Sequence, residues 1–244
     1  MPSLLQSLSD LLMPRFCAVC DRRLETRERV VCNKCLAELP LTQFKGKRNT
    51  PVDRLFYSQR SFERGTAYMF YVPNTSVAYP VLRLKYSNMV SAGLFFGERM
   101  ARELMEGDFF DGIDCLVPVP LALARRWKRG YNQSAIIAEG IAKATGLRLR
   151  TDLLKRIRNN KTQTRLSRTA RRQNVEGIFR APHPERLEGL HVLLVDDVIT
   201  TGATVTECIR TLQEANPSVK VSVAAWCVST SLCELPGFTY DLEL

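Results

Sequence analysis

Two adjacent acids, followed by a run of small and hydroxyl-bearing residues, form the segment with the clearest chemical character. The acids and the run are Asp196, Asp197, Thr200, Thr201, Gly202, Ala203 and Thr204. Backbone N–H groups and hydroxyls at the start of a helix can hold a phosphate, because the helix dipole also favours negative charge there. Carboxylates beside a phosphate are repelled by it unless they accept hydrogen bonds from hydroxyl groups or coordinate a metal ion. A sugar phosphate meets both demands.

The elements around this segment predict how it is positioned. Four apolar residues, Val192 to Val195, precede the acids and are typical of a strand buried on both faces. A helix is predicted to follow over residues 203–215. Ligands of open α/β sheets bind at the carboxyl ends of strands, which is where these acids and the turn after them are expected.

Strands and helices alternate through the rest of the chain. We predict strands over residues 56–58, 66–72, 113–118, 191–195 and 219–228, and helices over 76–86, 91–105, 132–145 and 203–215. This rhythm indicates right-handed crossovers and a parallel α/β sheet. The longest apolar stretches are much shorter than the roughly 18 residues that a membrane helix needs, so no membrane span is expected.

Four of the eight cysteines form two C-x-x-C pairs near the amino terminus, namely Cys17, Cys20, Cys32 and Cys35. Two such pairs can place four thiolates around a zinc ion at about 2.3 Å from each sulfur. Structural zinc is the prediction, and an iron ion, a redox pair or disulfides are the alternatives. The chain start lacks the features of a secretory signal, so a cytoplasmic location is expected, and that location disfavours disulfides.

The remaining cysteines, Cys115, Cys208, Cys227 and Cys233, are scattered and are expected in the core. Leucines at helical spacing over residues 4–12 predict a short amphipathic helix. Residues 42–51 are polar and basic with Gly and Pro, and they are interpreted as a linker. We therefore divide the chain into residues 1–50, with the helix, the metal module and the linker, and residues 51–244, the main domain.

Positive charge is concentrated in about a quarter of the chain. The net charge is +10, and between Arg125 and Arg180 there are 16 basic residues and three acidic ones. Such a segment favours a polyanionic partner, which could be nucleic acid, a phosphorylated metabolite or an acidic membrane surface.

The segment from Val192 to Thr204 resembles the signature of type I phosphoribosyltransferases. The resemblance implies an α/β fold of that type, a parallel sheet flanked by helices, which follows the small amino-terminal zinc-ribbon module that the cysteines predict. It implies that Asp196 and Asp197 are the catalytic acids and contact the ribose hydroxyls of 5-phosphoribosyl-1-pyrophosphate (PRPP). The residues from Thr200 to Thr204 would hold its 5′-phosphate.

Further motifs are similar to those of the ComF family of competence-linked proteins. They are the four-cysteine knuckle, Pro118 to Leu121, Gly130 to Gln133 and the segment from Arg158 to Phe179. The resemblance implies that Val119 and Pro120 approach pyrophosphate, that Arg156 to Gly177 forms a mobile hood loop, and that Mg²⁺ bridges diphosphate and ribose oxygens. The basic residues expected to face pyrophosphate or nucleic acid are Arg125, Arg126, Lys128, Arg129, Arg158 and Lys161.

Three functions remain open at this point. The protein is a phosphoribosyltransferase that releases pyrophosphate, or a PRPP-binding sensor or scaffold without turnover, or a single-stranded DNA-binding module in which Trp127 or Tyr131 stacks on bases. The third can coexist with either of the others. The resemblance implies a role in DNA uptake and natural transformation, with a helicase or single-strand-handling proteins as partners. The sequence identifies neither the acceptor nor a general base, and His183 and His191 are predicted to be non-catalytic.

Overall fold

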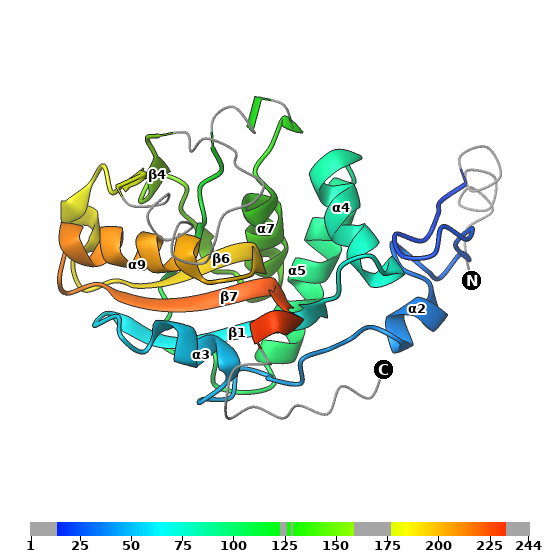
Figure 1. Ribbon diagram of the computed structural model, residues 1–244, viewed down its shortest axis with the longest axis horizontal. Helices are drawn as coiled ribbons and strands as arrows, with labels where there is room; N and C mark the ends of the chain where they lie inside the picture. The colour runs from blue at the N-terminus through cyan, green and yellow to red at the C-terminus, as the bar shows by residue number, and fades with distance from the viewer. Residues whose placement is uncertain (1–13, 123–125, 128, 159–176, 233–244) are drawn as a thin grey trace.

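The computed structural model describes residues 14–122, 126–127, 129–158 and 177–232. Figure 1 shows a central sheet with helices on both faces and a small amino-terminal module at one end. In chain order the elements are α2 (Asn33–Ala37), α3 (Pro51–Phe56), β1 (Phe62–Tyr71), the 3-10 helix η1 (Ser76–Ala78), α4 (Tyr79–Tyr86), α5 (Val90–Leu104), β2 (Cys115–Pro118), α7 (Gln133–Thr145), β3 (Arg148–Leu149), β4 (Lys155–Arg156), β5 (Phe179–Arg180), the 3-10 helix η2 (Pro184–Leu187), β6 (His191–Ile199), α9 (Ala203–Ala215), β7 (Lys220–Ser229) and the 3-10 helix η3 (Thr230–Leu232).

Five strands form the central sheet in the order β1-β7-β6-β2-β3, and every neighbouring pair is parallel. This confirms the predicted parallel α/β architecture. Strands β4 and β5 form a separate antiparallel pair. The carboxyl ends of the five parallel strands meet at one edge of the sheet, which is where ligands bind in folds of this kind.

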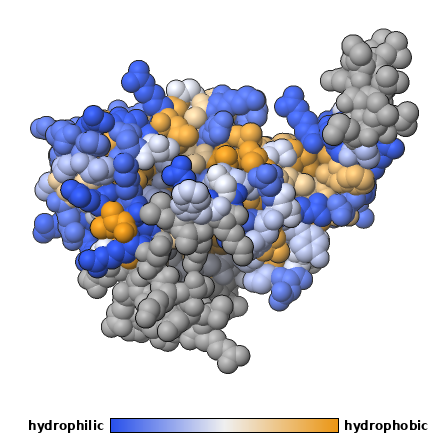
Figure 2. Space-filling model, turned by 90° about the horizontal axis from the view of Figure 1, so that it is seen from above, coloured by the Kyte–Doolittle hydropathy of each residue, from blue (hydrophilic) through white to orange (hydrophobic). Residues whose placement is uncertain are grey.

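Each face of the sheet has its own hydrophobic core. Along β6, Val192 and Leu194 pack with the residues of α3 and α9, whereas Leu193 and Val195 pack with those of α4, α5 and α7. The alternation follows from the period of two in a strand, and the run is apolar throughout because both faces are covered. Seen from above, hydrophobic residues are concentrated in the half of the molecule toward the amino-terminal module, and the opposite end is largely hydrophilic (Figure 2).

Helices α5 and α7 cross with their backbones in close contact. A Cβ atom on Gly97 would lie 2.2 Å from the carbonyl oxygen of Ile137, and one on Gly140 would lie 2.4 Å from that of Leu94. Only glycine fits at either position, because real Cβ atoms essentially never come closer than 3.0 Å to another heavy atom. The crossing therefore fixes the position of α7, whose amino-terminal end faces the carboxyl edge of the sheet.

The strand predicted over residues 56–58 is wrong, because Phe56 is the last residue of helix α3 and residues 57–58 form a turn. The side chain of Thr50 accepts a hydrogen bond from the amide of Asp53, and the carboxylate of Asp53 accepts one from the amide of Thr50. This capping box, with Pro51 at the first helical position, starts a helix where the aromatic residues alone suggest a strand.

Residues 42–51, interpreted as a linker, are attached to the edge of the sheet. Leu41 forms an antiparallel bridge with Met69 of β1, and the amide of Phe70 donates to the carbonyl of Pro40 at 2.8 Å. Phe44 is buried and packs edge-on against Phe70. The helix predicted over residues 4–12 lies outside the described residues.

The other predicted elements agree with the structure except at their ends. Helix α9 has the predicted bounds, Asn132 caps α7, and Gly146 ends it with a φ of 77°. Strand β6 continues past the predicted end at residue 195 to Ile199, so that the two acids lie within the strand. The scattered cysteines are buried as predicted, apart from Cys233, which lies outside the described residues. No described helix combines the length and the apolar character needed to cross a bilayer.

Candidate active site

The two acids on β6, called the acid pair below, lie at the carboxyl edge of the sheet in different surroundings. Asp196 is buried, and its Oδ1 accepts hydrogen bonds from the Ser134 hydroxyl at 3.2 Å and from the Asp197 amide at 2.9 Å. The Oδ1 of Asp197 accepts the amide of Val198 at 2.7 Å. Ser134 belongs to the first turn of α7, so the glycine crossing described above also sets the position of this donor.

A lysine missing from the sequence prediction completes the acid pair. The Nζ of Lys85, on α4, lies 2.8 Å from Oδ2 of Asp197, and both side chains are about four-fifths buried. No signal in the sequence indicates this contact, because Lys85 belongs to another helix, far from the acids along the chain. The site thus holds two carboxylates and one ammonium.

The surroundings of the acid pair change its protonation. Burial, together with the charge of Asp197, raises the pKa of Asp196 to about 7, although the Asp197 amide, Lys85 and Ser134 act in the opposite direction. Burial opposes the charged form of Lys85, but the carboxylates outweigh it and raise the pKa of the ammonium. One proton on Asp196 can therefore be gained or lost near neutral pH.

The threonine turn (Thr200 to Thr204) surrounds a small hollow beside Asp196. The hollow has a volume of about 30 Å³ and is lined by Asp196 and residues 198–205. The first intrahelical hydrogen bond of α9 runs from the Thr206 amide to the Gly202 carbonyl, and Gly202, at the N-cap, has no side chain to cap the helix. The Ala203 amide donates to Oγ1 of Thr201 at 3.4 Å. The amides of Thr204 and Val205 have no intrahelical acceptor and can receive an anion.

Gly202 gives the threonine turn its shape. Its φ is 74°, a conformation that other residues rarely adopt, and a Cβ atom there would lie 3.2 Å from the ring of Phe56. Phe56 is the last residue of α3, so the helix that sequence reasoning missed forms the support beneath this turn.

A larger cavity of about 520 Å³ lies between the loop after β2, the start of α7 and strand β4. Its lining is Pro118, Pro120, Leu121, Arg126, Gly130, Tyr131, Asn132, Ala135, Ile136, Thr151, Leu154, Lys155 and Arg156. The wall combines apolar side chains with three cationic ones. It can therefore hold an anionic group next to a flat or apolar one.

Val119 and Pro120, the two residues expected to approach pyrophosphate, differ in the backbone hydrogen-bonding groups that they present. Val119 is buried, its amide donates to the Val195 carbonyl at 2.9 Å, and its carbonyl accepts from the Asn132 side chain at 2.9 Å. Pro120 lines the cavity but has no N–H. Neither residue therefore presents a free backbone donor to an anion.

The basic residues singled out in the sequence do not all gather at the cavity. Arg126 lines it, and Arg129 donates to the side chain of Gln133 at 2.9 Å and lies over the ring of Tyr86. Arg158 is exposed just beyond β4. The others, Arg125, Lys128 and Lys161, lie outside the described residues, as do residues 159–176 of the hood loop.

The four cysteines of the amino-terminal module come together. Their sulfurs all lie within 4.8 Å of one another, and those of Cys20 and Cys32 are 3.8 Å apart, the separation expected for sulfurs at about 2.3 Å from a tetrahedral ion. Amide groups donate to the sulfurs of Cys17 and Cys32. Burial raises the pKa of Cys32, but hydrogen bonds from Arg22 and the Cys35 amide outweigh it and lower this pKa to about 6. The residues fit a four-sulfur metal site.

The described residues offer no comparable protein ligand set for magnesium. Among the described residues, the cysteines are the only group of three or more potential ligands close together. A Mg²⁺ ion at the acid pair would therefore be held mainly by oxygens of a bound ligand and by water, which suits its preference for keeping several waters.

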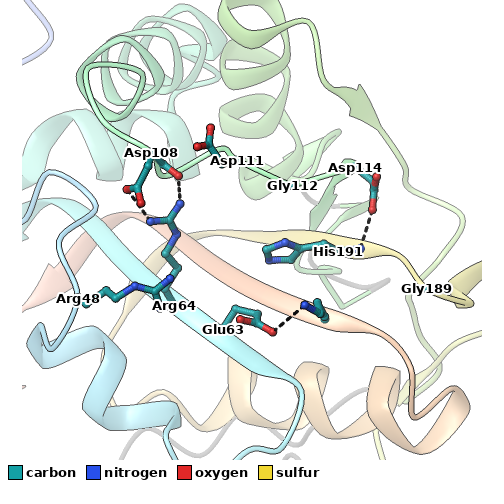
Figure 3. A pocket seen from close by; sticks show the side chains of 10 residues that line it. Arg48, Glu63, Arg64, Asp108, Asp111, Gly112, Asp114, Gly189 and His191 are labelled. Carbon is teal, nitrogen blue, oxygen red and sulfur yellow. Dashed lines mark hydrogen bonds and ion pairs between the residues drawn. The ribbon is translucent and has the colours of Figure 1, made fainter.

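A further cavity, of about 390 Å³, lies at the opposite, amino-terminal edge of the sheet (Figure 3). Arg64 pairs with Asp108 at 2.9 Å, and Asp114 accepts the backbone amide of His191 at 2.7 Å. The imidazole of His191 lies 2.9 Å from the Ser222 hydroxyl. His191 thus has a partner at the edge remote from the acid pair.

Comparisons with known proteins bear on these features. The family model described as phosphoribosyl transferase domain matches residues 91–231. The chain is 30% identical over 220 residues to the DNA utilization protein YhgH of Salmonella typhi, a match that covers 88% of this chain and 90% of that protein. It is 35% identical over 110 residues to the competence protein ComFC of Bacillus subtilis, covering 44% and 41% of the two chains. A structure of glutamine PRPP amidotransferase from B. subtilis overlaps 56% of this chain and 26% of that one, with 26% identity and a TM-score of 0.38.

Proposed function

This chain belongs to the ComF family of phosphoribosyltransferase-fold proteins, and we propose that it binds PRPP at the carboxyl edge of its sheet. The observation that carries the proposal is one hollow in which a buried carboxylate adjoins the start of α9, where backbone amides lack intrahelical acceptors. The backbone amides need an anionic acceptor, and the carboxylate needs hydroxyl donors. A phosphorylated pentose has both kinds of group.

The proposed binding mode assigns each part of PRPP to a feature of the site. The 5′-phosphate is received by the threonine turn, and the ribose hydroxyls donate to Asp196 and Asp197. The diphosphate extends toward the larger cavity, where Arg126, Lys155 and Arg156 supply positive charge. Mg²⁺, if it arrives with the diphosphate, neutralises part of its charge.

The same arrangement supports phosphoribosyl transfer. Displacement of pyrophosphate leaves positive charge on the sugar ring and negative charge on the leaving group. Carboxylates under the ribose stabilise the former, and the cationic side chains of the cavity stabilise the latter. The apolar part of the cavity, including Leu121, Ile136 and Leu154, leaves space for an acceptor. If no acceptor reacts, the same site serves as a PRPP sensor without turnover.

Calorimetry with the metal-loaded protein, Mg²⁺ and PRPP tests the binding proposal. The variant combining Asp196→Asn and Asp197→Asn should bind PRPP at least tenfold more weakly, since hydrogen bonds to charged groups are worth about 1.5–3 kcal/mol. Asp111→Asn, at an exposed acid of the opposite cavity, is the control and should bind as the wild type does. Unchanged affinity in the double variant would refute the site.

Pyrophosphate release separates enzyme from sensor. We expect the wild-type protein to release pyrophosphate from PRPP when free bases or single-stranded DNA are supplied as acceptors. Binding without release across the whole acceptor panel would favour the sensor.

A second function, binding of single-stranded nucleic acid, is favoured by one surface observation. Trp127 is 88% exposed next to Arg126, and Tyr86 is 70% exposed beneath Arg129. Exposed aromatic rings flanked by cations are typical of proteins that stack the bases of a single strand. Tyr131, the other aromatic residue considered, donates its hydroxyl to the Leu84 carbonyl and is less available.

PRPP binding and single-strand binding together suggest a cellular role. Relatives of the chain bear the names DNA utilization protein and competence protein. We propose that PRPP binding and single-strand binding serve DNA uptake in the cytoplasm, in contact with a helicase or single-strand-handling proteins.

A further inference from the structure

Helix α4 contacts the cysteine module through Arg83. Its Nη1 donates to the carbonyl oxygen of Cys17 at 3.0 Å and lies 3.2 Å from the carboxylate of Asp21. Both partners belong to the turn of the first C-x-x-C pair, in which the Asp21 amide also donates to the Cys17 carbonyl. The Arg83 side chain therefore binds a turn whose shape depends on the cysteine cluster.

The same helix contacts the acid pair through Lys85, two residues further along. Lys85 holds Oδ2 of Asp197 at 2.8 Å. On a helix of eight residues, Arg83 and Lys85 point in different directions, so one short element touches both places. Figure 1 shows α4 between the module and the helices α5 and α7.

The body of α4 is held firmly enough to act as one piece. Val81 and Leu84 are buried in the core that also contains the cysteine module. The hydroxyl of Tyr131 donates to the Leu84 carbonyl, and Arg129 covers the ring of Tyr86. The last turn of α4 is thus attached to the loop before α7, which forms a wall of the larger cavity.

We propose that α4 couples metal binding in the cysteine module to PRPP binding at the acid pair, with Arg83 and Lys85 as the two ends of the link. The inference rests on the proposed function. A metal ion holds the first C-x-x-C turn in shape, and this turn holds Arg83. Arg83 then keeps α4 where Lys85 can orient the carboxylate of Asp197 toward the ribose. Lys85 is a positioning residue in this scheme, because it acts through Asp197.

The coupling must work in both directions. If metal binding favours PRPP binding, PRPP must by thermodynamic linkage favour metal retention to the same degree. Couplings of this kind change affinities about 5- to 150-fold. The affinity for the metal is therefore a readout that needs no catalytic turnover.

The experiment measures the zinc affinity of the full-length protein by equilibrium competition with a chromogenic chelator, with and without saturating Mg²⁺ and PRPP. Calorimetry on the zinc-loaded protein gives the PRPP affinity. For the wild type we expect PRPP to raise the zinc affinity at least about fivefold. Arg83→Gln should remove this effect and weaken the binding of both PRPP and zinc. Arg102→Gln, at an exposed arginine that pairs only locally with Glu98, should behave as the wild type does.

A second variant keeps the test decisive if Arg83→Gln fails to fold. Lys85→Gln leaves the module untouched, so its zinc affinity without PRPP should equal that of the wild type, while the increase caused by PRPP should disappear. A wild-type protein that binds PRPP and has the same zinc affinity with and without it would overturn the coupling and leave the proposed function standing. A wild-type protein that does not bind PRPP would overturn both.

Discussion

At the scale of the residue, two chemically identical neighbours on β6 acquire different properties. Asp196 is buried next to Ser134, and Asp197 is paired with Lys85. Sequence alone could identify both acids, because they stand between an apolar run and the threonine turn, and this order is the recognisable motif. It could not identify Lys85 or Ser134, since only the packing of α4 and α7 against the sheet brings these side chains to the acids.

The raised pKa of Asp196 predicts that PRPP binding depends on pH. Ionised Asp196 accepts hydrogen bonds from ribose hydroxyls, so affinity should rise several-fold from pH 6 to pH 8, with proton release on binding near pH 7. Calorimetry in buffers of different ionisation enthalpy measures this release. In Asp196→Asn, only the contribution of the ligand's own phosphates should remain. A wild-type profile identical to that of the variant would contradict the assignment.

The same shift affects stability with the opposite trend. The folded-state pKa of Asp196, about 7, lies above its ordinary value of 3.8. Its contribution to the free energy of unfolding is therefore fully present below pH 3.8 and is lost as the pH rises through 7. Ligand binding and fold stability thus favour different protonation states of one carboxyl group.

At the scale of the element, periodicity predicted the helices and the buried strands well, because their apolar residues repeat at 3.6 or follow one another without interruption. It failed at α3, where the capping box of Thr50 and Asp53 decides the structure and the aromatic residues mislead. It also ended β6 too early, since acids within a strand look like the start of a turn. The close crossing of α5 and α7 could not be predicted, because single glycines in helices do not reveal their partners.

The close contact between α5 and α7 predicts that adding a single methyl group there destabilises the protein. Gly140→Ala would place Cβ 2.4 Å from the Leu94 carbonyl oxygen, and the resulting separation of the helices should cost about 1–3 kcal/mol or more of unfolding free energy. Urea unfolding measures the change. Gly107→Ala is the control, because a Cβ there meets nothing within 4 Å. Equal midpoints for the two variants would show that α5 and α7 can separate freely.

At the scale of the whole molecule, the positive charge noted in the sequence reaches the site only in part. Arg126, Lys155 and Arg156 line the larger cavity, whereas Arg150 pairs with Asp152. Composition could predict a polyanionic partner. It could not predict which cations are already neutralised within the protein, because that depends on contacts between distant parts of the chain.

Binding of single-stranded DNA should accordingly depend on a few residues. Trp127→Ala is expected to weaken binding of a labelled oligothymidine by about 1–3 kcal/mol through lost stacking. Arg126→Gln should reduce the slope of log affinity against log salt by about 0.7 if it contacts one phosphate. Fluorescence anisotropy over a salt series measures both effects. Tyr57→Ala, at an exposed aromatic residue at the end of α3, should change neither. Loss of affinity there equal to that in Trp127→Ala would indicate non-specific adhesion.

The antiparallel bridge between Leu41 and Met69 has a consequence for the solubility of the chain. Strand β1 is the outermost strand of the sheet on its side, and residues 40–42 cover part of its free backbone groups. Bare outer strands invite pairing with other molecules, which leads to aggregation. A fragment that begins after residue 50 would lack this cover and would present the inner residues of β1 to its neighbours. The amino-terminal segment therefore protects the sheet from self-association, independently of any metal that the cysteines bind.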